Sequence, residues 1–355
     1  MQQPPDDVST HDLARTLRER WGLAVAPGDL VHAPVGFGDH HWTTGDGTWF
    51  VTVADVAAAG RFAALRQALG SAAALASRGG LEFVVAPAAT PEGEVVVRLD
   101  ERYALALYPY VEGAPGHFGE AVPEAERITL ARLLARLHAA TPKVTATPTA
   151  ATAPEPTTPK VTATPPVHEP GLLAHRAALD AALDELDTPW PDGGPFTEPA
   201  RELLASHGPQ AIRAALAGFD EAAARIAATE PVLTHGEPHP GNVLRLTGGR
   251  LTLIDWDTLA LAPPERDLWL AAGSCAPAID AYRETSGREV SAEALAFYGL
   301  RWLLDDVCVY VAQFRAPHTA TADTEAALPY LRRSLEVAVG STAPATQGSE
   351  RPGGA

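Results

Sequence analysis

Two hydrophobic spacings alternate along the first part of the chain, one typical of helices and the other of strands. In residues 9–22, apolar side chains recur at every fourth position, which predicts a helix with one buried face. Residues 30–53 instead contain short runs rich in Val, Phe, Trp and Thr, and the pair Asp46 and Gly47 is typical of a tight hairpin turn. A helix followed by two antiparallel strands is therefore predicted.

The same alternation continues as far as residue 140. Helical spacing returns from Phe62 to Leu75, and the pair Gly79 and Gly80 predicts where this helix ends. Residues 124–140 again carry apolar side chains at helical spacing. Between these helices, β-rich runs predict strands at residues 81–85, 94–99 and 102–108. The first third of the chain should thus form a small mixed sheet with one inserted helix.

The composition changes abruptly at residue 141. Residues 141–168 are almost all Thr, Pro, Ala and Val, and the octet TPKVTATP occurs at 141–148 and again at 158–165. Such a segment cannot bury enough apolar surface to offset the entropy lost on ordering, so we expect residues 141–168 to form a disordered insertion. Both lysines of the chain, Lys143 and Lys160, lie inside it, and every other fixed cation is an arginine.

Beyond the insertion the spacing is mostly helical, with one polar interruption. The predicted helices cover residues 172–186, 199–228, 265–273, 292–314 and 324–339. The interruption holds three predicted strands, at residues 232–234, 242–246 and 251–255, the last two on either side of a Gly-Gly turn. This pattern places a polar hairpin inside a helical region.

The expected fold class is α+β, with two lobes in sequence. Residues 1–110 should form a small β-rich lobe that begins with a helix, and residues 111–340 a larger helical lobe that carries the polar hairpin. Residues 341–355 are small and polar and include Pro and Gly, so a disordered tail is predicted for them.

The charge of the chain is strongly acidic. Lys and Arg total 27 against 44 Asp and Glu, which gives a net charge of −17. A surface of this kind repels phosphate backbones and anionic lipid, so nucleic acid and membrane surfaces are disfavoured as partners and a cationic small molecule is favoured. Hydrophobic residues make up 46% and charged residues 20%, which argues against a disordered or membrane chain.

The chain shows neither a cysteine framework nor a targeting segment. Cys275 and Cys308 stand alone without a CxxC pair, which argues against a cysteine zinc site. The start, MQQPPDDVST, lacks the apolar core of a signal peptide, and no apolar run approaches the roughly 20 residues that span a bilayer. We expect a cytoplasmic protein.

The polar hairpin concentrates the candidate chemistry. It reads LTHGEPHPGNVL and then LIDWD, and polar groups packed this densely at strand ends indicate a site, because they cost desolvation unless they are paired. One hypothesis is a metal hydrolase, since His235 and His239 lie four apart with Glu237 between them. However, Pro238 and Pro240 disrupt the helix that such a zinc site requires.

The other hypothesis is phosphoryl transfer. It needs a carboxylate that positions the acceptor hydroxyl, then an amide oxygen, then a carboxylate on the next strand, so that oxygen ligands hold Mg²⁺ over a phosphate chain. Glu237, Asn242 and Asp255 occur in that order. The residue types therefore favour this hypothesis over the hydrolase.

The segments HGEPHPGN, LIDWD and ALAPPERDLW resemble the catalytic and metal-binding loops of the aminoglycoside phosphotransferase and choline kinase family. The resemblance implies a bilobal protein-kinase-like fold. It also implies that Glu237 is the catalytic base, that Asn242 and Asp255 bind Mg²⁺ with help from Asp257, and that His235 braces this catalytic loop by hydrogen bonding.

The same resemblance assigns the nucleotide to the small lobe. Gly36 and Gly38 lie where the family has its phosphate-covering strand pair, and glycines let backbone N–H groups approach phosphates. Tyr108 and Tyr110 lie where the family has the hinge that binds adenine. The implied phosphate donor is ATP or GTP.

Two positions depart from the family pattern. Thr52 stands where the family carries a phosphate-binding lysine, and Arg66 and Arg98 are the arginines that we considered as replacements. Glu237 stands where the family has Asp, so its carboxylate lies one methylene further from the backbone. Glu can still accept a proton.

Two functions of different classes remain open. The first is a kinase that transfers phosphate to a hydroxyl of a small molecule, such as an aminoglycoside-like antibiotic or an amino-alcohol metabolite, with Asp305 and Asp306 as candidates for binding a cationic acceptor. The second is a nucleotide- or metabolite-binding protein on a kinase scaffold that has lost transfer activity. The absent lysine and the altered base motivate the second.

Overall fold

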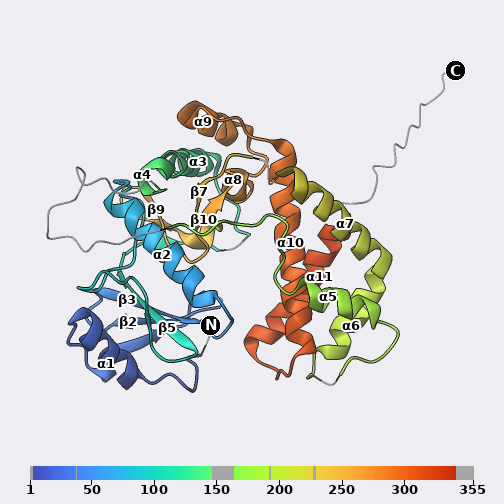
Figure 1. The fold of residues 1–355 in the computed structure, drawn as a ribbon, viewed down its shortest axis with the longest axis horizontal. Helices are drawn as coiled ribbons and strands as arrows, with labels where there is room; N and C mark the ends of the chain where they lie inside the picture. Colours follow the sequence, from blue (N-terminus) through green and yellow to red (C-terminus); the bar gives the residue numbers. More distant parts are fainter. Residues whose placement is uncertain are drawn as a thin grey trace. The chain divides into compact units, whose positions relative to one another are not determined.

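The computed structural model describes residues 3–36, 38–117, 119–145, 164–191, 193–226 and 229–340. Two compact units make up the chain, Met1–Glu169 with Thr229–Ala296, and Pro170–Ala228 with Phe297–Ala355. The first unit therefore combines the β-rich region with the polar hairpin. Figure 1 labels the elements of both units.

The first helix lies where the spacing of apolar side chains in residues 9–22 predicted it. Helix α1 runs over Thr10–Trp21, the side chain of Ser9 accepts the N–H of Asp12, and Gly22 ends the helix with a φ of 71°. A Ser cap and a glycine in the left-handed region are the usual start and stop of a helix, because each satisfies backbone groups that the helix leaves unpaired.

A five-stranded antiparallel sheet follows, in the order β1-β2-β3-β5-β4. Its strands are Leu30–Ala33, His40–Thr44, Trp49–Asp55, Val97–Arg98 and Tyr103–Pro109 for β1 to β5. The hairpin predicted around Asp46 and Gly47 joins β2 and β3, and β1 adds a third strand where two were predicted. The predicted strand at residues 94–99 is reduced to β4.

The sheet has helices on both faces, since successive side chains of a strand point to opposite sides. Val51 and Val53 of β3 pack with Leu13 and Leu17 of α1 in one core cluster. Ala54 belongs to a second cluster that includes residues of α2, Arg61–Ser77. Thr52 therefore points to the same face as Ala54, away from α1.

The remaining elements of the first unit surround the polar hairpin. They are α3 (Glu124–Ala139), β6 (Ala114–Pro115), β7 (Val232–Thr234), β8 (Val243–Arg245), β9 (Leu251–Leu253), β10 (Ala260–Ala262), α8 (Glu265–Ala271) and α9 (Ala276–Ser286). Strands β8 and β9 pair as predicted, with β6 added at the edge, whereas β7 pairs with β10, which was not predicted. The predicted strand at residues 81–85 is wrong, because this segment makes only an isolated bridge from Val84 to Leu253.

The predicted insertion begins later than its composition indicated. Thr141–Thr145 form helix α4, and Val144 is only 1% exposed in the core cluster that also contains residues of α2 and α3. The Thr141 hydroxyl oxygen accepts the backbone N–H of Leu233 at 2.8 Å. A buried apolar side chain and a hydroxyl with a partner thus pack this short end against the first unit. The predicted insertion also ends earlier, since Val167 forms an isolated bridge to Leu261 and the backbone N–H of His168 donates to the Leu261 carbonyl at 2.9 Å. Residues 146–163 lie outside the described residues.

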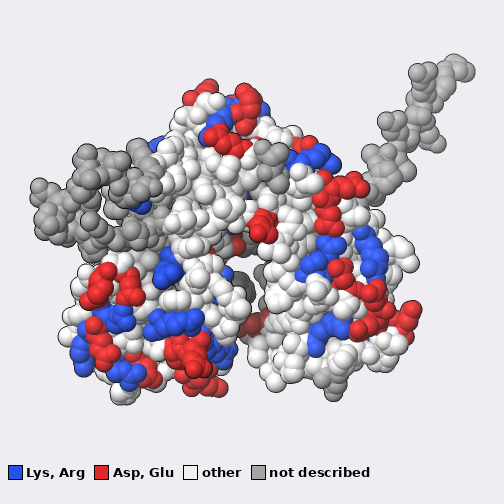
Figure 2. Space-filling model, in the orientation of Figure 1, with Lys and Arg blue, Asp and Glu red and all other residues white. Residues whose placement is uncertain are grey.

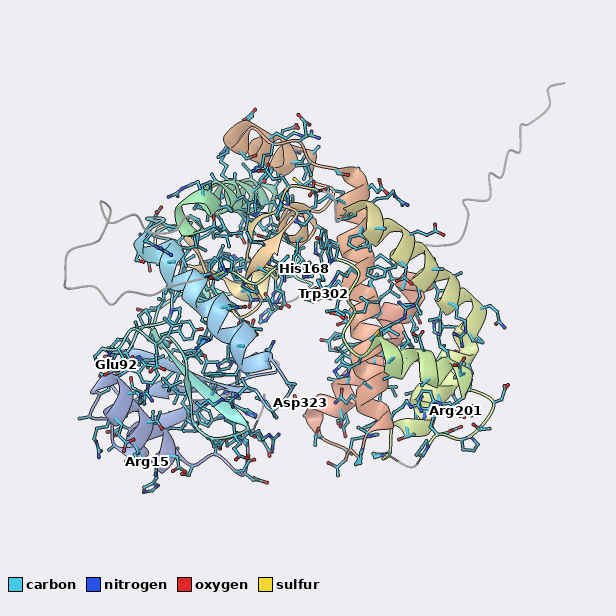
Figure 3. All side chains as sticks on the ribbon, in the orientation of Figure 1. Arg15, Glu92, His168, Arg201, Trp302 and Asp323 are labelled. Carbon is cyan, nitrogen blue, oxygen red and sulfur yellow. The ribbon has the colours of Figure 1, made fainter. Side chains whose placement is uncertain are left out.

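The second unit is helical within the residues described. It holds α5 (Arg176–Asp184), α6 (Thr197–His207), α7 (Pro209–Ile226), α10 (Ala292–Arg315), which begins in the first unit, and α11 (Ala322–Gly340). The single helix predicted at residues 199–228 is two helices, because Gly208 turns the chain at a φ of 82° and Pro209 starts a new helix without needing an N–H partner. On α6, Arg201, which Figure 3 labels, donates to Glu198 at 2.8 Å.

The α+β fold class is confirmed. The predicted tail at residues 341–355 lies outside the described residues. No helix within the described residues is long and apolar enough to cross a membrane.

Candidate active site

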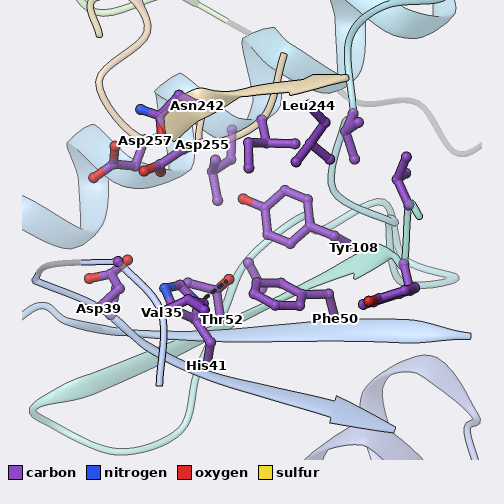
Figure 4. Close-up of a pocket in the computed structure, with 18 of the residues that line it drawn as sticks. Val35, Asp39, His41, Phe50, Thr52, Tyr108, Asn242, Leu244, Asp255 and Asp257 are labelled. Carbon is purple, nitrogen blue, oxygen red and sulfur yellow. Dashed lines mark hydrogen bonds between the residues drawn. The ribbon is translucent and has the colours of Figure 1, made fainter. Parts of the chain in front are cut away.

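A pocket of about 300 Å³ lies in the first unit, where the sheet, α2 and the polar hairpin meet. Its apolar walls include Leu65 of α2, Ala104 and Tyr108 of β5, and Leu244 of β8. In Figure 4, three polar side chains gather on one side of this pocket: Asn242, Asp255 and Asp257. The pocket thus has a largely apolar interior and an acidic edge.

The loop between β7 and β8 is closed by its own hydrogen bonds. The side-chain amide of Asn242 donates to the carbonyl oxygen of Glu237 at 3.0 Å, and the backbone N–H of His239 donates to the same oxygen at 2.8 Å. A short 3-10 turn, Pro240–Asn242, completes the loop. Since the Asn242 nitrogen is used in this way, its amide oxygen is left for a cation.

His235 joins this loop to the end of β9. Its Nε2 lies 2.8 Å from the carbonyl oxygen of Ile254, its Nδ1 accepts the backbone N–H of Glu237 at 3.2 Å, and its ring packs 4.5 Å from that of Trp256. Burial lowers the pKa of His235, so the ring is neutral with the proton on Nε2. Both ring nitrogens bond to backbone groups, as expected of a residue that braces the loop.

Asp267 of α8 fixes the start of the same loop. It accepts the backbone N–H groups of His235 at 2.9 Å and of Gly236 at 2.7 Å, and the Nε2 of His138 at 3.0 Å. Burial alone would raise the pKa of Asp267, but the bonds from His138 and from the loop bring it below its ordinary value. Gly236 has a φ of 104°, and a Cβ there would collide with Arg266, so the loop requires glycine.

Asp255 leaves β9 in an unusual backbone conformation. Its φ is 65°, in the left-handed region that Asp and Asn tolerate better than most residues. Desolvation within the pocket wall, followed by the negative charges of Asp257, Glu237 and Asp39, raises the pKa of Asp255 well above its usual range. A bound cation would remove this unfavourable crowding of carboxylates.

The oxygen donors at this edge fit a magnesium ion. Asn242, Asp255 and Asp257 supply hard oxygen ligands from one wall, and Mg²⁺ characteristically uses one or two protein carboxylates and completes its shell with water and substrate phosphates. In the part of the chain that the structure describes, no three His, Cys, Asp or Glu side chains form a ready-made metal site. Asn242, Asp255 and Asp257 would supply part of a magnesium shell.

The predicted nucleotide residues line the pocket with one exception. Gly36, Tyr108 and Tyr110 lie in its wall, whereas Gly38 does not, although its φ of 92° still requires glycine. The Tyr108 side chain projects into the pocket in Figure 4. The backbone N–H of Tyr110 already donates to the carbonyl of Thr48 at 2.9 Å.

Beneath the glycine-containing turn, Thr52 takes the place of the absent lysine. Its hydroxyl lies 3.2 Å from the Nδ1 of His41, whose ring stacks on Phe50 at 5.0 Å between centroids. Burial lowers the pKa of His41 to about 4, so this ring is neutral near pH 7. No positive charge is contributed at this position.

The arginines that the sequence suggested do not reach the pocket. Arg66 is exposed on α2, and Arg98 lies over the Phe62 ring at 4.4 Å and donates to the carbonyl of Glu101. Neither is among the residues that line the pocket.

Sequence reasoning missed two charged residues at the acidic edge. Asp39 lines the pocket, and burial, reinforced by the charge of Asp257, raises its pKa to about 7. Arg61, the first residue of α2, pairs with Asp257 at 3.0 Å. The available signal for Asp39 was its place directly after Gly38. Arg61 gave none, because its partner lies 196 positions away.

Asp305 and Asp306 belong to the second unit. Asp305 accepts the backbone N–H of Ala174 at 2.8 Å, and Asp306 accepts the hydroxyl of Ser334 at 3.2 Å. Burial raises the pKa of Asp306 to about 6. Their predicted role in binding an acceptor stays a prediction.

The β-rich region, the hairpin and the helices around it have the arrangement of protein-kinase-like enzymes that phosphorylate small molecules. A model of the phosphotransferase enzyme family matches residues 40–305, and the chain belongs to this family. Protein StrN of Streptomyces griseus is 34% identical over 273 residues, which span 74% of this chain and 74% of StrN. The family predicted from the three hairpin segments is thus confirmed.

Solved structures of low sequence identity share the fold. Spectinomycin phosphotransferase APH(9)-Ia, in complex with ADP and spectinomycin, is similar with a TM-score of 0.68 and 16% identity, over 94% of this chain and 98% of that one. Choline kinase LicA from Streptococcus pneumoniae is similar with a TM-score of 0.53 and 13% identity, over 94% of this chain and 98% of that one.

Proposed function

We propose that this phosphotransferase moves the terminal phosphate of ATP or GTP to a hydroxyl group of a small molecule. The observation that carries the proposal is the coupling of Glu237 to the acidic edge of the pocket. The Asn242 amide holds the Glu237 carbonyl at 3.0 Å, while Asn242 and Asp255 line the same pocket. The backbone of the proposed base is thereby kept in a fixed relation to two proposed cation ligands, which supports the positioning that phosphoryl transfer requires.

Each residue of the site has a distinct task in this proposal. Glu237 orients the acceptor hydroxyl and takes its proton as the new bond to phosphorus forms. Asn242 and Asp255 would hold Mg²⁺, which would supply neutralising charge to the phosphates. His235 keeps the loop and the end of β9 at a constant separation.

The nucleotide residues complete the proposed site. The turn with Gly36 and Gly38 covers the phosphates, and Tyr108 and Tyr110 contact the base in the apolar interior. The lobe of residues 1–110 would carry most nucleotide contacts and the lobe of residues 111–340 the transfer chemistry. The ADP bound to the spectinomycin phosphotransferase supports a nucleotide donor.

For the acceptor we propose a cationic, hydroxylated small molecule, such as an aminoglycoside-like antibiotic or an amino alcohol. The net charge of −17 favours a positively charged ligand. On the face that Figure 2 shows, the arginines of the described residues are interspersed with Asp and Glu and form no continuous basic patch there. We further propose that the protein works in the cytoplasm, where nucleoside triphosphates are available.

A second candidate function is a binding protein that has lost transfer activity. Thr52 in place of a lysine, and Glu237 in place of Asp, favour this alternative. Turnover separates the two candidates, because a binder would retain the nucleotide without consuming it.

The test is an assay of the purified protein with Mg²⁺ and either ATP or GTP against a panel of aminoglycosides, other hydroxylated antibiotics and amino alcohols. We expect at least one acceptor to gain one phosphate, detected by mass spectrometry, with one equivalent of nucleoside diphosphate formed. Nucleotide binding without any consumption across the panel would favour the binding protein instead.

A further inference from the structure

The pocket lacks the positive charge that a phosphate chain needs. Three aspartates line it, Asp39, Asp255 and Asp257, and none of its described lining residues is Lys or Arg. A nucleoside triphosphate entering this pocket would be repelled by the carboxylates. A divalent cation offsets part of this repulsion, but the proposed function still leaves the chain without a fixed cation at the phosphates.

Arg61 is held at the edge of this pocket by one of its aspartates. Its Nη2 donates to the Oδ2 of Asp257 at 3.0 Å, with side-chain exposures of 41% and 20%. This is the single side-chain hydrogen bond of Arg61 within the described residues, so the other N–H groups of its guanidinium remain available. The positive charge of Arg61 also opposes the rise in the pKa of Asp39.

The backbone of α2 sets the position of Arg61. Gly60 precedes it with a φ of 81°, and Arg61 is the first residue of a helix whose Leu65 and Leu69 line the apolar wall. The helix is anchored in the core by these leucines, so its first turn cannot drift away from the pocket. A guanidinium fixed in this way suits phosphate, because its planar fork can donate two parallel hydrogen bonds.

We propose that Arg61 is the phosphate-binding cation of this protein and that it substitutes for the lysine that Thr52 replaces. Asp257 then acts as the residue that orients Arg61, in addition to any contact with Mg²⁺. This inference rests on the proposed function, since it assigns a residue to the nucleotide of that same site.

The experiment is a calorimetric titration of a non-hydrolysable ATP analogue with Mg²⁺ into the wild type, Arg61→Ala, Arg61→Gln and Asp257→Asn. Arg66→Ala and Arg98→Ala are the matched controls, because no ion pair joins either arginine to a carboxylate that lines the pocket, within the described residues. Loss of a charged hydrogen-bond donor should weaken binding roughly tenfold or more in both Arg61 variants. The two controls should stay within about twofold of the wild type.

Further outcomes separate this inference from the proposed function. Asp257→Asn should weaken binding, and in the double variant with Arg61→Ala the two losses should be less than additive, because the two residues act as a pair. If the wild type binds the analogue and both Arg61 variants bind it equally well, the role of Arg61 is overturned and the proposed function still stands. Absence of nucleotide binding in the wild type would overturn both. Circular dichroism and thermal melting verify that each variant is folded.

Discussion

The Nε2 of His235 lies 2.8 Å from the carbonyl oxygen of Ile254, the residue directly before Asp255. This partly buried bond joins the loop of the proposed base to the strand end that carries a proposed cation ligand. A backbone carbonyl buried without a partner costs free energy, so the bond is maintained. The distance between the two halves of the site is thus set by one imidazole ring.

Replacing this ring should affect both stability and catalysis. His235→Ala leaves the Ile254 carbonyl and the Glu237 N–H without their partner and opens a cavity beside Trp256. We expect a loss of roughly 3 kcal/mol in the free energy of unfolding, measured by urea denaturation. We also expect kcat to fall about 100-fold while KM for the nucleotide changes little, because the loop is misplaced rather than removed. An unchanged kcat would contradict the bracing role.

Glu237 should be indispensable for transfer but not for nucleotide binding. Glu237→Gln keeps the size of the side chain and removes its ability to accept a proton, so kcat should fall roughly 100- to 10,000-fold. Glu237→Asp restores a carboxylate and should retain much more activity than the glutamine variant. The measurement is the rate of phosphate transfer to the best acceptor of the panel. Equal rates for Glu237→Gln and the wild type would exclude this residue as the base.

The stability of the protein should depend on the protonation of His41. Its pKa is about 4 in the folded state against an ordinary value of 6.5, because the ring is buried under the pocket. Between these two pH values the unfolded chain binds more protons than the folded protein, so stability falls as the pH drops from 6.5 to 4. The urea midpoint of the wild type should decrease across this window, and that of His41→Gln should decrease less.

His11→Gln is the control for this experiment, because it changes an exposed histidine of α1. It should show the same decrease as the wild type. If His41→Gln also follows the wild type at every pH, the buried ring is not responsible for the dependence.

The start of the Thr- and Pro-rich segment should contribute to stability. Val144 is 1% exposed and Val167, near the other end of the segment, is 70% exposed. Val144→Ala should therefore lower the free energy of unfolding by about 2 kcal/mol, through lost burial and the cavity left behind. Val167→Ala should change it by less than about 0.5 kcal/mol. Equal effects of the two substitutions in urea denaturation would show that α4 does not pack as described.

Local sequence signals predicted the helices and turns that neighbouring residues determine. The caps of α1 and the β2–β3 turn lie within a few residues of the groups that they satisfy, so the spacing of apolar side chains and the Asp46–Gly47 pair were enough to locate these elements. The same reasoning missed the break between α6 and α7, since helical spacing continues across Gly208 and Pro209. Composition misjudged α4, because a single buried Val144 outweighs its polar neighbours.

The residues of the candidate site likewise include some that local sequence predicted and some that it did not. Asn242 directly precedes β8 and Asp255 follows β9, and these consecutive strands pair, so their spacing along the chain predicted that they share one wall. The pairing of Arg61 with Asp257 joins positions 196 residues apart and depends on how α2 packs beside the hairpin. No local pattern encodes such a contact, which is why Arg66 and Arg98 were considered instead.

The most direct test of the central claim is the Mg²⁺ dependence of nucleotide binding, measured by calorimetry with a non-hydrolysable ATP analogue in the wild type and in Asp255→Asn. Asparagine tolerates the left-handed backbone of this position and removes only the charge. Binding to the wild type should require Mg²⁺, and Asp255→Asn should bind at least about tenfold more weakly in its presence. Equal affinity with and without Mg²⁺, together with unchanged binding in Asp255→Asn, would contradict the account.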